Sequence, residues 1–252
     1  MTAATPCLLL PGLLDDARLW RHQVDCLSAL VSPVVGDLTK ADSMAALAAD
    51  VLARVSAGRF ALAGLSMGGY VAMEIMRQAP ERVRALALLD TTARPDSPEA
   101  TASRRKLMAL AETDFPAVTR TLMPRLVHPE RLNDQALTQV IVSMADGVGK
   151  EAFRRQQRAI IDRIDSRPHL SRIACPTMVL CGREDALTPL EGHEEMAGAI
   201  PGAKLVVIEH CGHLSTLERP GQVSEAMKKW LESILFCGCG DDTKSGSSED
   251  EY

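Results

Sequence analysis

The stretch that decides the fold runs RFALAGLSMGG over residues 59–69. Arg59 to Leu65 is an apolar run of strand length, and Met67 to Ala79 then places apolar residues at helical spacing. A sharp strand-to-helix turn presents a serine hydroxyl clear of the chain and leaves little room for side chains two residues to either side, where Gly64 and Gly68 stand. Ser66 is therefore the candidate nucleophile. The alternative is a tight glycine turn that only packs a helix on a strand.

Apolar runs and amphipathic segments alternate on both sides of this stretch, which is typical of βαβ units around a buried, mostly parallel sheet. The expected strands are 6–11, 33–38, 59–65, 83–89, 176–181 and 204–209, and the expected helices are 17–30, 43–55, 67–79, 189–199 and 220–235. The sequence thus predicts an α/β fold with a central sheet flanked by helices.

One long segment interrupts the alternation. From about Thr92 to Arg172 strands are absent, and the sequence reads as several helices separated by prolines. We therefore expect an α/β core over 1–91 and 173–236, with a helical cap inserted at 92–172. The last segment, 237–252, is rich in Gly, Ser and acidic residues, so a disordered acidic tail is expected there.

Composition narrows the class of protein. The chain has 252 residues, of which 46% are hydrophobic, and this excludes disorder, collagen and coiled coil for its bulk. The net charge of −5 is uneven, because residues 93–172 carry 14 Lys and Arg against 10 Asp and Glu, a balance of +4. A near-neutral body without a basic run argues against nucleic-acid binding.

The first residues of the chain and the cysteines indicate the compartment in which the protein is expected. Met1 to Pro6 carries no basic residue and the apolar run after it is too short for a signal peptide or a bilayer span, so a cytoplasmic protein without membrane association is expected. The seven cysteines form no C-x-x-C pair and have no histidines at zinc-site spacing. We expect reduced thiols, no metal and no cofactor.

A serine nucleophile needs a base, and a late histidine after a strand suits that role. His213 follows the strand that ends at Glu209, and Gly212 lets the loop leave the sheet and project the ring. His210, nearer the strand end, is the alternative. The remaining histidines lie on expected helices or in the insertion and are interpreted as exposed or packed side chains: His22, His128, His169 and His193.

The third member must be a carboxylate that orients the imidazole and stabilises its protonated form. Asp185 follows the strand 176–181, at the edge of the sheet where ligands bind in open α/β folds. Glu184 and Asp90 are the competitors, and Asp90 ends the strand 83–89. Ser66, Asp185 and His213 are the preferred catalytic set.

A tetrahedral intermediate also needs donors for its oxyanion. The backbone N–H of Met67, at the start of the helix after Ser66, is one candidate. The second is the N–H of Leu13, in the loop after the first strand, where Gly12 permits a bend.

These residues together resemble the α/β-hydrolase family across roughly 6–235. The resemblance rests on Leu62 to Gly69, Pro80 to Val83, Pro176 to Asp185, and Gly212-His213 followed by Glu218-Arg219-Pro220. Within the family, the chain resembles small bacterial hydrolases such as enol-lactonases and carrier-protein methyl ester esterases. The resemblance implies an eight-stranded sheet with a helical cap and hydrolysis without a cofactor.

The chain departs from the family pattern at two places. Family members usually carry His-Gly after the first of these strands, where this chain has Pro11-Gly12, and the loop after the next strand is shortened to 36–42. The geometry of the oxyanion loop is therefore less well defined by the sequence than that of the nucleophile.

The predicted function is a cofactor-independent serine hydrolase that cleaves a carboxylic ester, lactone or thioester through an acyl-enzyme. The alternatives are hydrolysis of a C–C bond in a dienoic acid or β-diketone, and a non-catalytic hydrolase-like protein that binds a ligand. The sequence leaves the oligomeric state open.

The cap supplies the clues to the substrate. Its arginine-rich clusters motivate the hypothesis of an anionic or carrier-linked acyl ester, against a solvated mixed-charge face. The clusters are Arg104-Arg105-Lys106 and Arg154-Arg155 with Arg158. Candidates for the roof of an aliphatic pocket are Leu107, Met108, Phe115, Leu122, Met123, Val127, Met144 and Phe153.

Overall fold

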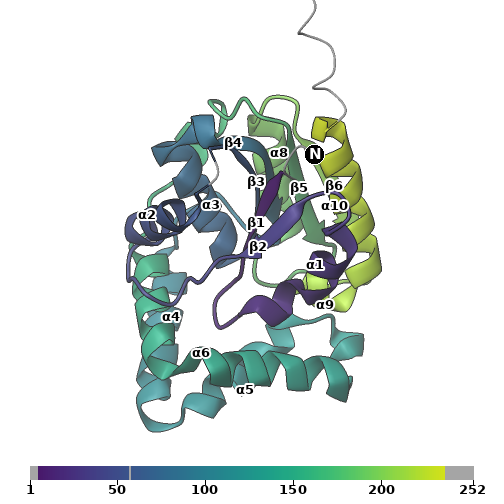
Figure 1. The fold of residues 1–252 in the computed structure, drawn as a ribbon. Helices are drawn as coiled ribbons and strands as arrows, with labels where there is room; N and C mark the ends of the chain where they lie inside the picture. The colour runs from purple at the N-terminus through teal and green to yellow at the C-terminus, as the bar shows by residue number, and fades with distance from the viewer. Residues whose placement is uncertain (1–4, 57, 236–252) are drawn as a thin grey trace, which may run out of the picture.

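A computed structural model describes residues 5–56 and 58–235 and contains one six-stranded sheet in the order β2-β1-β3-β4-β5-β6 (Figure 1). The strands are β1 (Pro6–Leu10), β2 (Ser32–Val35), β3 (Phe60–Leu65), β4 (Val83–Leu89), β5 (Thr177–Gly182) and β6 (Lys204–Ile208). Every pairing is parallel. The predicted α/β class with a parallel central sheet is confirmed. The eight strands implied by the family resemblance are wrong for the part of the chain described, which forms six.

Helices alternate with the strands, as the sequence predicts. They are α1 (Arg21–Leu27), α2 (Met44–Arg54), α3 (Met67–Gln78), α4 (Pro98–Thr113), α5 (Phe115–Leu126), α6 (Gln135–Ile161), α7 (Arg167–Leu170), α8 (Leu190–Ala199), α9 (Ser215–Glu218) and α10 (Pro220–Leu235), with 3-10 turns η1 (Ala17–Trp20), η2 (Pro80–Arg82) and η3 (Pro129–Arg131). The helix predicted over 17–30 is split into η1 and α1. None of the helices in the described ranges is long and apolar enough to cross a membrane.

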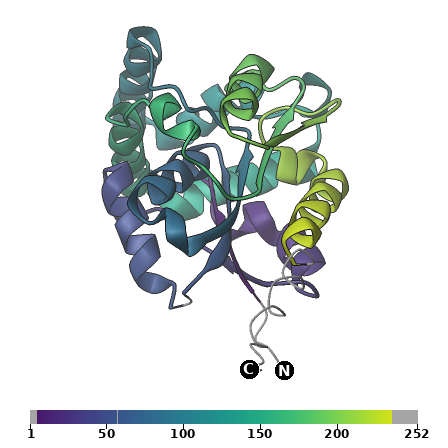
Figure 2. The same cartoon turned by 90° about the horizontal axis from the view of Figure 1, so that it is seen from above.

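Helices cover both faces of the sheet, which explains why its strands are apolar runs rather than alternating ones (Figures 1 and 2). On one face, Leu62 and Leu86 pack with residues of α2, α3 and α8. On the other, Ala61 and Ala85 pack with residues of α1 and α10. The central strands β3 and β4 are thereby buried on both sides and form a rigid base for the residues that follow them.

The strand order reverses beside β1, because the chain passes from β1 to β2 on one side and then returns to β3 on the other. In open α/β sheets, ligands bind at such a point, outside the carboxyl ends of the strands. The loops after β1, β3, β5 and β6 carry the residues predicted to act, so the topology gathers them at one edge.

Between β4 and β5 the chain forms the helical segment, which we define as residues 92–172. Its helices α4, α5 and α6 lie together at one end of the sheet (Figure 1). The side chains of Ser97, Asp114 and Asp134 cap these helices by accepting backbone N–H groups. Several prolines that the sequence suggests as helix breaks instead occupy first turns, as Pro98 does, where a missing N–H costs nothing. The predicted tail, 237–252, lies outside the described residues.

Candidate active site

Ser66 occupies a strained turn between β3 and α3. Its backbone has φ of +53° and ψ of −115°, a region that residues other than glycine rarely adopt. The turn is tight, because a Cβ on Gly64 would overlap the carbonyl of Gly68, and a Cβ on Gly68 would overlap that of Leu10. The two glycines therefore do what the sequence pattern predicts, and they let the chain turn sharply enough to lift the Ser66 hydroxyl out of the sheet.

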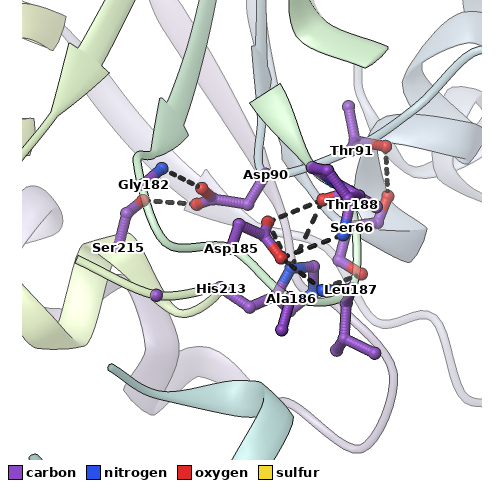
Figure 3. A network of polar contacts seen from close by, with 12 residues as sticks. Ser66, Asp90, Thr91, Gly182, Asp185, Ala186, Leu187, Thr188, His213 and Ser215 are labelled. Atoms are coloured by element: carbon purple, nitrogen blue, oxygen red, sulfur yellow. Dashed lines mark hydrogen bonds and ion pairs between the residues drawn. The ribbon is translucent and has the colours of Figure 1, made fainter. Parts of the chain in front are cut away.

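Three side chains from separate loops meet at this turn (Figure 3). The Nε2 atom of His213 lies 2.9 Å from the Oγ atom of Ser66. The Nδ1 atom of the same ring lies 2.7 Å from Oδ2 of Asp185. Ser66 follows β3, Asp185 follows β5 and His213 follows β6, so the structure brings together the three residues that the sequence selects as catalytic.

The Asp185 carboxylate is fixed by its own loop. Oδ1 accepts the backbone N–H groups of Leu187 at 2.8 Å and of Thr188 at 2.9 Å. Oδ2 accepts the Thr188 hydroxyl at 2.7 Å besides facing His213. These bonds leave the carboxylate one orientation, and they favour its ionised form.

Asp185 and His213 are both buried, and each shifts the pKa of the other. Burial alone would lower the pKa of His213, but the charge of Asp185 and its hydrogen bond raise that pKa above the usual value. Burial alone would raise the pKa of Asp185, but His213 and the bonds from Thr188 lower it. The pair thus stabilises a protonated imidazole, which a base needs after it has taken a proton.

The competing residues lie elsewhere. His210 is exposed, and its ring packs edge-on against that of His128. Glu184 accepts the backbone N–H of Cys211 at 2.9 Å and does not reach His213. Neither is placed to act on Ser66.

Asp90 has a different position from the one that a triad acid would need. Its carboxylate accepts the backbone N–H of Gly182 at 2.9 Å and the hydroxyl of Ser215 (Figure 3). Burial and the neighbouring charge of Asp185 raise its pKa well above the usual value. Asp90 therefore ties together the segments that carry Asp185 and His213.

The loop after β1 presents a free backbone donor beside Ser66. Among the described residues, the N–H groups of Leu13 and Met67 have no hydrogen-bond acceptor, while the next N–H in the loop, that of Leu14, donates to Oε1 of Gln156 at 3.2 Å. Leu14 has a φ of +63°, and the buried Gln156 also donates to the carbonyl of Leu38 at 3.3 Å. An α6 side chain thus fixes the loop that the sequence selects for an oxyanion donor.

A cavity of about 500 Å³ opens onto Ser66 and His213. Its wall combines Leu13, Leu14 and Asp15 with residues of α4, α5, α6 and α8. Of the apolar residues proposed for the roof, Leu107 and Leu122 belong to this wall. The other six are absent from it, and several pack within the helical segment, as Phe153 does against Phe115. The volume is in the range of pockets that hold small ligands.

The arginines of the two basic clusters also differ in whether they line the cavity. Arg104 lines the cavity, whereas Arg154, Arg155 and Arg158 do not. Arg154 pairs with Glu112, and Arg155 donates to the carbonyl of Thr39. These two bonds explain why part of the basic character read from the sequence is used within the fold.

Two buried groups lie near the site, Asp15, which the sequence analysis did not single out, and His193, which it interpreted as an exposed or packed side chain. Asp15 lines the cavity, and burial raises its pKa to about 7. His193 is buried, and burial lowers its pKa to about 4. Its Nε2 accepts the backbone N–H of Thr91 at 2.9 Å, and the Thr91 hydroxyl donates to the carbonyl of Ser66 at 2.8 Å. No motif marks either residue, because their roles depend on which loops become neighbours.

One group of side chains has donor atoms close enough to share a metal ion. These atoms, on His128, Glu184 and His210, lie within 4.8 Å of one another. Nδ1 of His128 accepts the backbone N–H of Glu130 at 3.2 Å, so the neutral ring carries its proton on Nε2, the nitrogen that faces Glu184. In this arrangement that nitrogen offers no lone pair to an ion.

Comparisons with known proteins agree with the fold. The family model described as alpha/beta hydrolase fold matches residues 36–220. The chain is similar to a pimeloyl-[acyl-carrier protein] methyl ester esterase of Nitrosomonas europaea, with 29% identity over 81% of this chain and 82% of the other.

Solved structures extend the similarity to nearly the whole chain. A thermophilic esterase from Thermogutta terrifontis has a TM-score of 0.86 and 33% identity, covering 92% of this chain and 91% of the other. An enol-lactonase from Burkholderia xenovorans has a TM-score of 0.83 and 25% identity, covering 91% of this chain and 92% of the other.

Proposed function

Since the chain belongs to the α/β-hydrolase fold family, we propose that it is a serine hydrolase that cleaves a carboxylic ester, lactone or thioester. The observation that carries the proposal is the continuous contact from Ser66 through His213 to Asp185, at 2.9 and 2.7 Å. The esterase and lactonase names of the relatives support an ester-type bond as the target. A small acyl ester is the substrate, either free or linked to a carrier as the name of the Nitrosomonas relative states.

The first half of the reaction forms an acyl-enzyme. Nε2 of His213 takes the proton of the Ser66 hydroxyl while Oγ attacks the substrate carbonyl, and Asp185 stabilises the imidazolium. The N–H groups of Leu13 and Met67 donate to the oxyanion of the tetrahedral intermediate. The imidazolium then gives its proton to the departing alkoxide oxygen or thiolate sulfur as the C–O or C–S bond breaks and the carbonyl re-forms, which releases an alcohol or a thiol.

Water completes the cycle. His213 takes a proton from a water molecule whose oxygen attacks the acyl carbon, and the Ser66 ester bond breaks as the proton returns to Oγ. The residues needed are the same three, so the reaction requires no cofactor. The helical segment acts as a cap, because residues of α4, α5 and α6 form much of the wall of the cavity above Ser66.

Replacing the nucleophile tests the proposal. We expect Ser66→Ala to lower kcat by about 10⁴-fold or more, since only binding and the oxyanion donors remain. A fluorophosphonate probe followed by peptide mass spectrometry should label Ser66 in the wild type and nothing in the variant. Ser103→Ala, which changes another serine of the cavity wall, is the matched control. Full activity in Ser66→Ala with an unchanged melting temperature would rule out the mechanism.

A further inference from the structure

Four arginines line the cavity, and they differ in how their charge is used. Arg94 pairs with Glu195 at 2.7 Å, outside the cavity wall. Arg125 is exposed and donates to the carbonyl of Ala186 at 2.8 Å. The other two, Arg104 and Arg163, share a single carboxylate. In this half-buried part of the wall, the charge of one carboxylate is therefore shared between two guanidinium groups.

The shared carboxylate is that of Asp96, whose side chain is 3% exposed. Arg104 approaches it at 2.6 Å through Nε and Arg163 at 2.5 Å through Nη1. Two guanidinium groups on one carboxylate leave this cluster, which we call the Arg104 cluster (Asp96, Arg104 and Arg163), with a net charge of +1. An excess charge with little access to water is a favourable place for an anion.

Arg163 and Arg104 differ in their remaining donors. Arg163 also donates to the carbonyls of Arg94 and Ile160, so its guanidinium is held by the backbone. Arg104 uses Nε for Asp96 and Nη1 for Oε1 of Gln157 at 3.2 Å. In the described part of the chain, its Nη2 has no acceptor. Since Arg104 also lines the cavity, this nitrogen can donate to a ligand there.

A second donor beside Arg104 is unpartnered. The side chain of Gln157 is fully buried, and its Nε2 has no hydrogen-bond partner within the described ranges. The contact with Arg104 fixes the amide so that Oε1, and not Nε2, faces the guanidinium. A buried NH2 group without an acceptor is unfavourable, because it has lost its hydrogen bonds to water. Gln157 is not part of the cavity wall, so its effect on a ligand is to hold the Arg104 guanidinium in place.

Acidic groups of the wall do not cancel this charge. Glu99 and Glu191 also line the cavity, but both are exposed to solvent, where their charge is screened. Burial raises the pKa of Asp15 to about 7, so it is only partly ionised at neutral pH, and the charge that acts on it most strongly is that of His213. The Arg104 cluster is therefore the main uncompensated charge in the half-buried part of the wall.

The Arg104 cluster lies close to the nucleophile along α3. Tyr70 is four residues after Ser66, about 6 Å along the helix. The Arg163 guanidinium stacks over its ring at 4.3 Å from the centroid. Tyr70 also lines the cavity. A short aliphatic acyl chain attached to Ser66 can therefore extend past Tyr70 toward the cluster.

We propose that Arg104 binds an acidic group at the far end of the acyl chain, so that the preferred substrates are half-esters or lactones that carry a free carboxylate. The inference rests on the proposed function, because it assigns the substrate class of the same cavity. Arg104 acts here as a specificity-determining residue and takes no part in proton transfer.

The test compares matched substrates. Monomethyl esters of succinate, glutarate, adipate and pimelate are assayed beside the neutral methyl esters of equal chain length, and the ratio of their kcat/KM values is measured. In the wild type, we expect one or more half-esters to be preferred. Arg104→Gln should lower that ratio by about 10- to 100-fold, the effect of losing a hydrogen bond to a charged group. Arg105→Gln, which changes the exposed neighbour on α4, should leave the ratio unchanged.

A measurement on the wild type guards against misfolding of the variant. Adipate should inhibit hydrolysis of neutral methyl hexanoate competitively, and hexanamide should not. Hydrolysis of neutral esters without preference for any half-ester, or a ratio that Arg104→Gln leaves unchanged, overturns the inference and leaves the proposed function standing.

The failure of the proposed function has a different signature. In that case neither type of ester is hydrolysed and Ser66 is not labelled. Calorimetric titration of adipate into the wild type and Arg104→Gln then decides the inference separately, because binding lost in the variant supports it and equal binding, or none to either, overturns it.

Discussion

Two regions enclose Ser66, and they are built differently. The loops at the carboxyl edge of the sheet are held by bonds between buried groups, such as those from Leu187 and Thr188 to Asp185. The helical segment contributes apolar side chains and arginines to the cavity, and one buried amide, Gln156, to the oxyanion loop. The difference teaches that the sheet edge fixes the reacting groups, while the helical segment fixes what can lie beside them. Changes at the sheet edge should therefore alter kcat, and changes in the helical segment should alter selectivity.

The largest effect should separate the two buried aspartates of the sheet edge. Asp185→Asn should lower kcat by about 10³- to 10⁴-fold, because an amide cannot stabilise the imidazolium and favours the wrong tautomer of His213. Asp90→Asn should cost less than about tenfold, because an amide oxygen can still accept the N–H of Gly182. Steady-state kinetics with melting temperatures as the folding control make the comparison. Equal losses in the two variants would mean that Asp90 shares the role of the acid.

The pH dependence of kcat/KM should report on the interaction between His213 and Asp185. The free imidazole of His213 is the active form, and the charge of Asp185 raises its pKa above 6.5. The value of kcat/KM should thus rise with pH to a plateau with a midpoint above 6.5, falling about tenfold per pH unit on the acid side. In Asp185→Asn the midpoint should move to lower pH, since the main cause of the raised pKa is gone. A wild-type midpoint at or below 6.5 contradicts the assignment of the base.

Gln156 should be an exception to the division of roles between the two regions. Although it belongs to the helical segment, Gln156→Leu should lower kcat by about 5- to 20-fold with little change in KM, because the Leu14 N–H loses its acceptor and the oxyanion loop loosens. Gln139→Leu, at an exposed position of α6 before the kink at Gly149, is the control. If KM alone rises in Gln156→Leu, the residue shapes the cavity and does not position the loop.

The smallest effect should come from the apolar wall. Leu122→Ala enlarges the cavity at α5, so kcat/KM should shift by about 3- to 10-fold in favour of longer acyl chains, with short acetyl esters unaffected. Met123→Ala is its matched control, since that side chain packs in the core and is absent from the cavity wall. An equal shift in both variants would indicate a general loosening of α5.

The sequence predicted the strand-to-helix turn at Ser66 well because the requirement is local. Ser66 needs only a strand, a sharp turn and two residues without side chains, and all of these lie within a few positions of each other. The parallel sheet was predicted equally well, since strands buried on both faces are continuous apolar runs. The number of strands was not predicted correctly, because the expected eight came from the family resemblance and not from apolar runs in this chain.

The helical segment was harder to predict. Eight apolar residues looked equivalent as roof candidates, because helical spacing marks a buried face without telling whether it meets a cavity or another helix. Only Leu107 and Leu122 meet the cavity. The arginines were likewise indistinguishable until their partners were known, as Arg104 and Arg154 show.

The sequence by itself determined the fold class, the position of Ser66 and the candidates His213 and Asp185, because each depends on local spacing or on strand order. Only the tertiary structure placed Asp185, and not Asp90, against His213, brought Gln156 to the loop after β1 and left Arg104 with an unused donor. Those outcomes depend on distances between residues 28 to 142 positions apart. Such distances are set when helices and sheet pack together, and no spacing along the chain encodes them.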